Sequence, residues 1–287
     1  MKHSINFGMD EYWNGNGGQK WLSFQEFMDG FLMSFGRQAM NAAHIRQGDH
    51  VLDIGCGCGE TSIDISRQVG SEGYVHGLDI SGLLVDKAMA NKALAEAKNI
   101  TFHLGDAQKF NFDKALSDLV FSRFGMMFFD DPVAAFSNMR QALKVNGRLA
   151  FACWNSVKDN EWVRLSLDVV GRHLALPQPA EIGEPGPFSL ADPQRIYRIL
   201  DDAGFSHIEI EQFNTPVIIG SKVEETCHFL TQMGPAGSVI SEAEADESII
   251  ANIFADLHEE LMPHKTEKGV ILNAAAWIVT ARNSSPS

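Results

Sequence analysis

Short apolar segments alternate with helical patterns through the middle of the chain. The apolar segments, rich in Val, Ile, Leu and Phe as strands buried on both faces should be, are residues 50–55, 74–80, 100–106, 115–124 and 148–154. Between them, residues 60–70, 81–98 and 131–147 carry apolar residues at helical spacing. This alternation predicts an α/β fold with a parallel, doubly wound sheet. Ser81 and Asp131, the latter followed by a proline, are predicted to cap the helices that follow them.

After residue 154 the pattern changes. Residues 160–176 read as helical, and the loop that follows contains several prolines. Residues 191–205 predict a helix ended by Gly204, and residues 207–214 and 274–282 predict strands. Most of 221–268 reads as helical, with one stripe predicted to pack in the core, made by Ile250, Phe254, Leu257 and Leu261. We expect one domain over 1–287, with an N-terminal helical lid at 1–45 and helical insertions at 155–190 and 221–268 that form a substrate cap.

Charge and composition exclude several classes of partner. The chain has 287 residues, 23 Lys and Arg against 37 Asp and Glu, and a net charge of −14 without any basic run, which argues against nucleic acid. The N-terminal stretch lacks the apolar core of a signal peptide, and the longest apolar stretch, 119–129, is too short to span a bilayer. The sequence therefore predicts a cytoplasmic protein without a membrane partner.

A glycine-rich turn follows the first predicted strand, in the sequence VLDIGCGCGE at 51–60. Glycines at 55, 57 and 59 let a ligand approach the main chain closely, and the amides at the start of the next helix favour an anion. The Cys-x-Cys pair inside the turn lacks the further ligands of a zinc site, so we expect no metal. A dinucleotide fingerprint would place a small residue where Glu60 stands, and a carboxylate there would repel a pyrophosphate. S-adenosylmethionine, which has a carboxylate and a sulfonium, suits the turn better.

Acidic residues follow the next two predicted strands. Asp79 ends the second strand, where it could accept hydrogen bonds from a ribose diol, and Asp106 follows the third, where it could accept from an adenine amine. Ligands of open parallel sheets bind at the carboxyl edge of the strands. Acids at the ends of successive strands beside a glycine turn therefore predict a nucleoside-binding site.

These motifs resemble those of the class I S-adenosylmethionine-dependent methyltransferases, in a bacterial small-molecule branch. VLDIGCGCG resembles their first motif, GLDIS the second and GDAQ the third, while residues 118–154 resemble the region of their fourth and fifth strands. EYWNGNGGQKW near the start and AAAWIVTAR at the end are also similar to that branch. The resemblance covers nearly the whole chain and is weakest in the two insertions. It implies a Rossmann-like sheet of seven strands whose last strand is antiparallel; LKVNGR departs from the Pro-Gly usual before the fifth strand.

The resemblance also implies roles for individual residues. Gly55, Gly57 and Cys58 would line the methionine part of the cofactor, with Cys56 between them, and Asp53 would position the turn or bind the ammonium through water. Asp79 would hold the ribose while Ile80 packs on the adenine, Asp106 and Ala107 would read the adenine edge, and Ser122 would lie near the sulfonium. Aromatic residues of the N-terminal lid would close over the cofactor, namely Tyr12, Trp13 and Trp21.

Methyl transfer from a sulfonium is an in-line displacement that depends on positioning and electrostatics. The acceptor pocket is expected to be lined by Trp21, Arg123, Phe124, Met127 and residues of the insertions, and its apolar character is compatible with a quinone precursor or a secondary metabolite. No general base is singled out among His103, His173 and His228. Two alternatives remain open at this point: a non-catalytic S-adenosylmethionine-binding protein, and an NAD(P)-dependent oxidoreductase.

Overall fold

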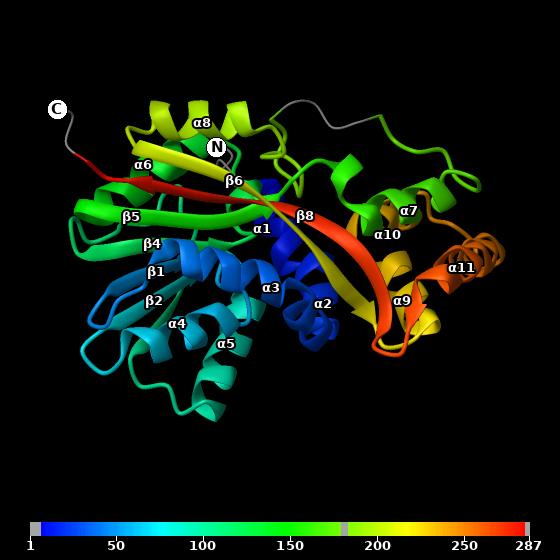
Figure 1. Cartoon of the computed structure of the whole chain (residues 1–287), viewed down its shortest axis with the longest axis horizontal. Helices are drawn as coiled ribbons and strands as arrows, with labels where there is room; N and C mark the ends of the chain where they lie inside the picture. Colours follow the sequence, from blue (N-terminus) through cyan, green and yellow to red (C-terminus); the bar gives the residue numbers. More distant parts are fainter. Residues whose placement is uncertain (1–6, 179–182, 285–287) are drawn as a thin grey trace.

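The computed structural model describes residues 7–178 and 183–284. A single mixed sheet forms the centre of the molecule, in the order β3-β2-β1-β4-β5-β8-β6, with the two-residue β7 paired to β8 (Figure 1). The first five strands are parallel, and β8 runs antiparallel to both of its main neighbours. The strands are β1 (His50–Ile54), β2 (Tyr74–Asp79), β3 (Ile100–Leu104), β4 (Ser117–Arg123), β5 (Leu143–Trp154), β6 (Ser206–Gly220), β7 (Lys265–Thr266) and β8 (Gly269–Arg282).

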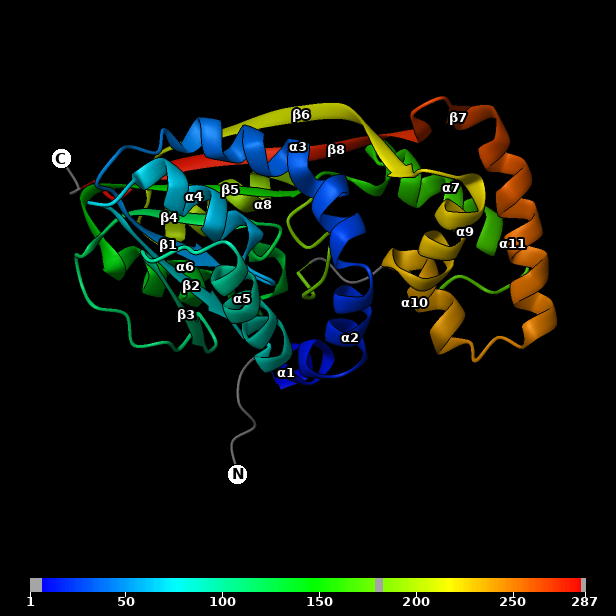
Figure 2. The ribbon, with the colours of Figure 1, turned by 90° about the horizontal axis from the view of Figure 1, so that it is seen from below.

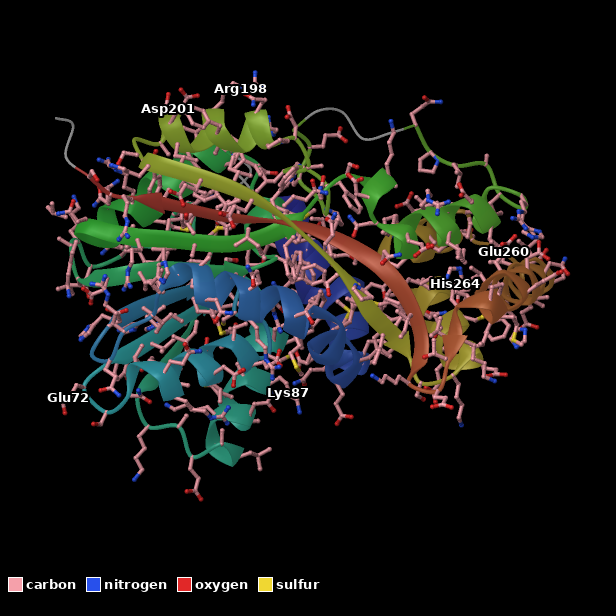
Figure 3. All side chains as sticks on the ribbon, in the orientation of Figure 1. Glu72, Lys87, Arg198, Asp201, Glu260 and His264 are labelled. Carbon is pink, nitrogen blue, oxygen red and sulfur yellow. The ribbon has the colours of Figure 1, made fainter. Side chains whose placement is uncertain are left out.

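Helices cover both faces of the sheet. One group lies on one face and a second group on the opposite face (Figure 1). The first group is α3 (Gln25–Ala43), α4 (Glu60–Val69) and α5 (Gly82–Leu94), and the second is α6 (Pro132–Ala142) and α8 (Pro193–Asp202). The predicted doubly wound α/β fold is confirmed, as is a sheet of seven long strands with an antiparallel last strand. Charged side chains such as Glu72, Arg198 and Asp201 point outward from these layers (Figure 3).

A helical lobe extends the molecule beyond one end of the sheet. β6 and β8 form a long antiparallel pair that continues past the other strands into this lobe, where four helices pack on one another (Figures 1 and 2). They are α7 (Glu161–Val170), α9 (Val223–Gln232), α10 (Gly234–Glu242) and α11 (Glu247–Leu261). Leu257 and Leu261 of α11 are fully buried, and Ile250 and Phe254 are half-buried, so the predicted stripe does pack inward.

The N-terminal segment divides into two parts. Two short helices, α1 (Phe7–Asn14) and α2 (Asn16–Ser23), lie between the sheet and the helical lobe (Figure 2). The longer α3 packs along β5, β6 and β8 and buries Phe31, Leu32 and Phe35 almost completely. Because α3 is part of the core, the prediction of a lid at 1–45 can apply only to the short helices α1 and α2 among the described residues. Residues 1–6 of the expected lid and 179–182 of the expected cap lie outside the described residues.

The predicted helix caps are confirmed. Ser81 Oγ accepts a hydrogen bond from Leu84 N at 3.4 Å, and Asp131 Oδ1 accepts one from Ala134 N at 3.0 Å. Each side chain satisfies an amide that has no partner within its own helix.

Several boundaries differ from the predicted ones. β6 runs on to Gly220 instead of ending at residue 214, and β8 begins at Gly269 instead of residue 274, because these two strands pair with each other along their length. Residues 143–147, expected to continue a helix, begin β5, because Asn283 donates side-chain hydrogen bonds to the carbonyls of Leu143 and Lys144. Residues 265–268, expected to be helical, form the short strand β7 and its turn into β8. The partner of the first segment is about 140 residues away in the sequence, whereas β7 pairs with residues of β8 that are only three to five positions further on.

Candidate functional site

The strand order reverses between β1 and β4, and ligands of open α/β sheets bind at the carboxyl ends of the strands at such a point. The glycine turn follows β1 there, and Phe124 and Gly125 follow β4. A Cβ added to Gly55 would lie 2.9 Å from the Cα of Gly125, so the two loops touch through bare backbone. Phe124 has a φ of 62°, an unusual value for a bulky residue that marks strain at this loop.

Gly57 faces open space in the turn. Its φ is 53°, and the nearest atom to an added Cβ would be Nε1 of Trp21, 3.8 Å away. At Gly55, in contrast, an added Cβ would collide with the backbone of Gly125. A side chain at 57 would therefore enter the space between the glycine turn and Trp21, which makes this space the place where a ligand can contact the turn.

Asp79 connects the glycine turn to the next loop. Its Oδ2 accepts a hydrogen bond from Gly57 N at 2.8 Å, and its Oδ1 accepts one from Ser81 N at 2.9 Å. Burial raises the pKa of the Asp79 carboxyl, and the backbone hydrogen bonds oppose that rise. Each carboxylate oxygen has lone pairs left over, so Asp79 can hold the turn and accept from ligand hydroxyls together.

Asp53 lies beneath the turn and is fully buried. Its Oδ2 accepts hydrogen bonds from Thr61 Oγ1 at 2.7 Å and Ser62 Oγ at 2.6 Å, whereas its buried Oδ1 has no hydrogen-bond partner in the described structure. Burial raises the pKa of Asp53 to about 6, against the opposing effect of the two hydroxyls and of the Arg123 charge. An orphaned buried carboxylate oxygen is costly, which indicates a missing donor or cation at this place.

Arg123 bridges two acidic side chains beside the turn. Its guanidinium contacts the Glu60 carboxylate and lies 3.2 Å from Oδ1 of Asp29, a residue of α3. Burial raises the pKa of Glu60 to about 7, although the Arg123 charge opposes this rise. Arg123 was expected to line the acceptor pocket. Its positive charge instead balances the negative charge of Glu60, and the argument against a pyrophosphate depended on that negative charge. That argument is weaker than the sequence suggested.

The short helices α1 and α2 are pinned over the carboxyl edge of β2. Asn14 Nδ2 donates to Ile80 O at 3.1 Å, and Asn14 Oδ1 accepts from Gly82 N at 2.9 Å. Ser81 Oγ donates to the carbonyl of Trp13 at 2.8 Å. No sequence pattern pointed to Asn14, because its partners are backbone groups of a loop 66 and more residues away.

Three aromatic rings, from α1, α2 and the segment after β4, pack against one another beside these helices. The Trp13 ring meets the Trp21 ring edge-on at 5.8 Å and the Phe128 ring at 5.3 Å. Trp13, Trp21 and Phe128 are half-buried, whereas Tyr12 is 47% exposed. The structure therefore brings Trp13 and Trp21 together above the glycine turn and leaves Tyr12 largely in solvent.

The remaining predicted cofactor residues surround the same edge. Asp106 is half-buried, and its Oδ1 accepts from Gln108 N at 2.9 Å. Ala107 is buried, and its carbonyl accepts from Asn138 Nδ2, a contact that the sequence did not suggest. Ser122 is fully buried, with its Oγ accepting from Gly125 N at 3.1 Å.

The two cysteines of the turn are buried thiols. Burial raises the pKa of Cys56 well above its usual value and that of Cys58 to about 12, so both stay protonated near neutral pH. They are free, as are Cys153 and Cys227. Among residues 7–178 and 183–284, no group of three or more His, Cys, Asp or Glu could hold a metal ion.

The two apolar residues expected at the acceptor pocket are mostly buried. Phe124 stacks on Trp154 with ring centroids 4.1 Å apart, and Met127 Sδ accepts from Trp154 N at 3.4 Å. Phe124 is 6% and Met127 2% exposed, so both form the floor of this region rather than a free surface.

The three histidines considered as bases are scattered. His173 Nε2 lies 2.8 Å from Asp256 Oδ2 in the helical lobe, and His103 lies on β3 in contact with His76. His228 is exposed, with its ring 5.7 Å from that of Phe24, which follows α2. None of the three has a hydrogen bond to the glycine turn among the described contacts.

A cavity of about 780 Å³ lies at the opposite edge of the sheet. It is lined by the last turns of α3 and by β5, β6 and β8, including Gln38, Arg148, Glu209 and Thr280. The residues of the glycine turn do not line it. Because parallel strands present ligands at their carboxyl ends, we assign the site to the glycine turn and not to this cavity.

These features define the class of the protein: a Rossmann-like α/β protein with a nucleoside-type cofactor site at the switch point of its sheet. The sequence profile of a methyltransferase domain family matches residues 45–204, more than half of the chain. The chain belongs to this methyltransferase domain family, and the resemblance to class I S-adenosylmethionine-dependent methyltransferases of small molecules is confirmed. S-adenosylmethionine is the methyl donor of that class.

Several relatives are methyltransferases of small molecules. The chain is 32% identical over 121 residues to the aklanonic acid methyltransferase DauC of Streptomyces sp. strain C5, covering 42% of this chain and 55% of the relative. It is 25% identical over 187 residues to a demethylmenaquinone methyltransferase of Staphylococcus epidermidis, covering 62% and 76%. The chain thus spans about half the length of the first relative and three quarters of the second.

A solved structure supports the fold. Phosphoethanolamine N-methyltransferase 2 from Haemonchus contortus, in complex with S-adenosyl-L-methionine, has a TM-score of 0.54 at 18% identity, covering 88% of this chain and 53% of that one. At this identity the likeness shows the fold alone. Within the described residues, no helix is long and apolar enough to cross a membrane.

The raised pKa of Asp53 predicts a pH-dependent stability. Between pH about 4 and 6 the native carboxyl keeps a proton that the unfolded chain has lost, so the free energy of unfolding falls as the pH rises. The difference between the pKa of Asp53 in the folded and in the unfolded chain corresponds to roughly 3 kcal/mol of unfolding free energy over the full titration. In urea unfolding at pH 4.5 and 6.5, we expect wild type to lose stability relative to Asp53→Asn by an amount of this order. A difference between the two proteins that stays constant with pH contradicts the assignment.

Proposed function

We propose that the chain transfers a methyl group from S-adenosylmethionine to a small, apolar, aromatic acceptor. The observation that carries the proposal is the space between Gly57 and Trp21, which an added Cβ would enter without meeting any other atom within 4 Å. Asp79 stands beside this space, and the orphaned Oδ1 of Asp53 lies beneath the turn. A glycine turn that leads into the N-terminus of α4, with acids around it, suits a ligand that carries both a carboxylate and positive charge.

The residues at the site fit this cofactor part by part. Gly55, Gly57 and Cys58, with Cys56 beneath them, would line the methionine end, and the unpartnered oxygen of Asp53 would receive its ammonium, directly or through a water. Asp79 would accept from the ribose hydroxyls. Ile80, Asp106 and Ala107 would surround the adenine, and Ser122 would lie at the end of β4 near the sulfonium.

The chemistry depends on position more than on acid or base groups. The bound cofactor supplies an electrophilic methyl group, and the chain's own residues exclude water and align the acceptor behind it. Trp13 and Trp21 would cover the site, while the carboxylates of Asp53 and Asp79 favour a cationic donor over its neutral product. Loss of that charge during transfer would favour release of the product, S-adenosylhomocysteine.

The acceptor class is inferred from the relatives and from the lining. Aklanonic acid and demethylmenaquinone, named in the two relatives, are the acceptors we take as guides. In this chain Trp21, Phe128, Phe124 and Met127 give the region beside the turn an apolar, aromatic character. Helical insertions at 155–190 and 221–268 would complete the cap over such an acceptor.

The proposal is tested by release of S-adenosylhomocysteine from S-adenosylmethionine with a panel of hydroxylated quinones and aromatic polyketides. We expect turnover with members of the panel, and a rise in acceptor KM in Phe124→Leu and Met127→Leu, which conserve most of the buried volume. The Kd for S-adenosylmethionine should stay unchanged in both variants. Tight cofactor binding without turnover on any member would favour a non-catalytic cofactor-binding protein, and an unchanged KM in both variants would remove these residues from the acceptor pocket.

A further inference from the structure

Two histidines face each other across the outer strands of the sheet, outside the cofactor site. His76 lies on β2 and His103 on β3, and the ladder pairs His76 with Thr101 and His103 with Leu78, so the two histidines are diagonal neighbours. Nδ1 of His76 lies 3.1 Å from Nε2 of His103. Both side chains are half-buried, so solvent reaches them.

The separation of the two nitrogens fits a shared metal ion. At metal–nitrogen distances of about 2.0–2.1 Å, two imidazole ligands lie about 2.9 Å apart at a right angle and about 3.3 Å apart at the tetrahedral angle. The observed 3.1 Å falls between these values. In the metal-free protein the same pair shares one proton in a hydrogen bond, which ion binding would replace by two nitrogen–metal bonds.

We propose that His76 and His103 form a two-histidine binding site for one divalent transition-metal ion of the Zn²⁺, Ni²⁺ or Cu²⁺ type. Imidazole nitrogen is a preferred ligand of these ions, and the remaining positions are taken by water. Two protein ligands make the site an exchangeable one, unlike the closed sites that hold structural zinc.

The surroundings of the pair agree with this assignment. Burial lowers the pKa of both imidazoles, which favours the neutral rings that bind metal ions, so an ion would have to displace only the one N–H proton that lies between the two nitrogens. The negative charge of Asp113 acts on His76, and the charge of His50 acts in the opposite sense. The Tyr74 ring packs beside the His76 ring with centroids 4.9 Å apart. The Tyr74 hydroxyl is hydrogen-bonded to Thr101 Oγ1 at 2.6 Å, which restrains the Tyr74 ring beside His76.

The pair is connected to the turn that carries Asp106. The ring of His103 meets that of Phe110 at 5.8 Å, and Phe110 N donates to the carbonyl of Asp106 at 2.8 Å. A Cβ on Gly105 would lie 2.7 Å from the Phe110 ring, so this ring packs directly on the turn. An ion bound at the two histidines would restrain this turn and alter the affinity for S-adenosylmethionine. The effect on affinity rests on the proposed function, whereas the binding of the ion does not.

The test is calorimetric titration of chelator-treated protein, free of any affinity tag, with Ni²⁺ and with Zn²⁺. We expect one saturable ion per chain, and a loss of about 10²-fold in affinity in His76→Gln and in His103→Gln, because each variant breaks a two-point attachment. His207→Gln is the matched control, since His207 is exposed on β6 and its ring contacts only Ser206 among the described hydrogen bonds. Equal binding by wild type and both pair variants overturns the proposal.

A second measurement needs no variant. Substoichiometric Cu²⁺ should broaden the imidazole NMR signals of His76 and His103 before those of the other histidines. Uniform broadening of all histidine signals would likewise overturn the site. Loss of ion binding in the pair variants with unchanged cofactor affinity would leave the proposed function untouched, so the two ideas fail separately.

Discussion

Gly57→Val is expected to lower S-adenosylmethionine affinity by at least about 10²-fold, or about 2.8 kcal/mol. The valine side chain would enter the space below Trp21, where we place the methionine end of the cofactor. Little in the protein opposes the side chain there, so the effect on the fold is mainly the backbone strain at a φ of 53°, about 1–3 kcal/mol. Isothermal titration with S-adenosylmethionine, beside thermal melting, separates the two effects.

Gly70→Val is the matched control for this variant. Gly70 has a φ of 68° in the loop after α4, and an added Cβ would meet no atom within 4 Å. The control carries backbone strain of its own without touching the glycine turn, since its φ of 68° with a ψ of −170° lies in a region essentially confined to glycine. We expect its cofactor affinity to equal that of wild type, and equal losses in the two variants would mean that strain, and not occupied ligand space, weakens binding.

Asp79→Ala is expected to reduce cofactor affinity by about 10²-fold or more. The alanine removes the acceptor for Gly57 N and Ser81 N, and hydrogen bonds to a charged group contribute about 1.5–3 kcal/mol each. It also removes the acceptor that we assign to the ribose hydroxyls. Titration with S-adenosylmethionine and with S-adenosylhomocysteine measures the loss, which should affect both ligands because both contain the ribose.

Asp86→Ala provides the comparison for charge alone. Asp86 is exposed on α5, and its substitution removes one negative charge near the same edge of the sheet. We expect its effect on affinity to be less than about threefold, in line with a screened surface charge. If Asp79→Ala binds both ligands as well as Asp86→Ala does, the ribose role of Asp79 is wrong.

Much of the fold could be predicted because its strands are buried on both faces. The segments at 50–55 and 74–80 became β1 and β2 almost residue for residue, since continuous apolar runs between turns leave few alternatives. The start of β5 at Leu143 could not be predicted in this way. Its backbone is held by Asn283, 140 residues away, and local periodicity contains no information about such a contact.

The glycine turn and the acids that follow the strands were also within reach of the sequence. Their positions at strand ends place them at one sheet edge, and the structure brings Asp53, Gly57 and Asp79 together there. The role of Arg123 was not predictable, because its partners Glu60 and Asp29 come from separate helices. The role of Asn14 could not be predicted for the same reason, since it contacts backbone groups of a loop that is distant in the sequence.

The central claim, that the glycine turn binds S-adenosylmethionine, is tested most directly by calorimetric titration of the purified protein with S-adenosylmethionine, S-adenosylhomocysteine and NADH. The account predicts saturable binding of the first two at one site per chain and no binding of NADH. Binding of NADH alone would contradict it, because the glycine turn would then hold a pyrophosphate, and the NAD(P)-dependent oxidoreductase would become the better interpretation.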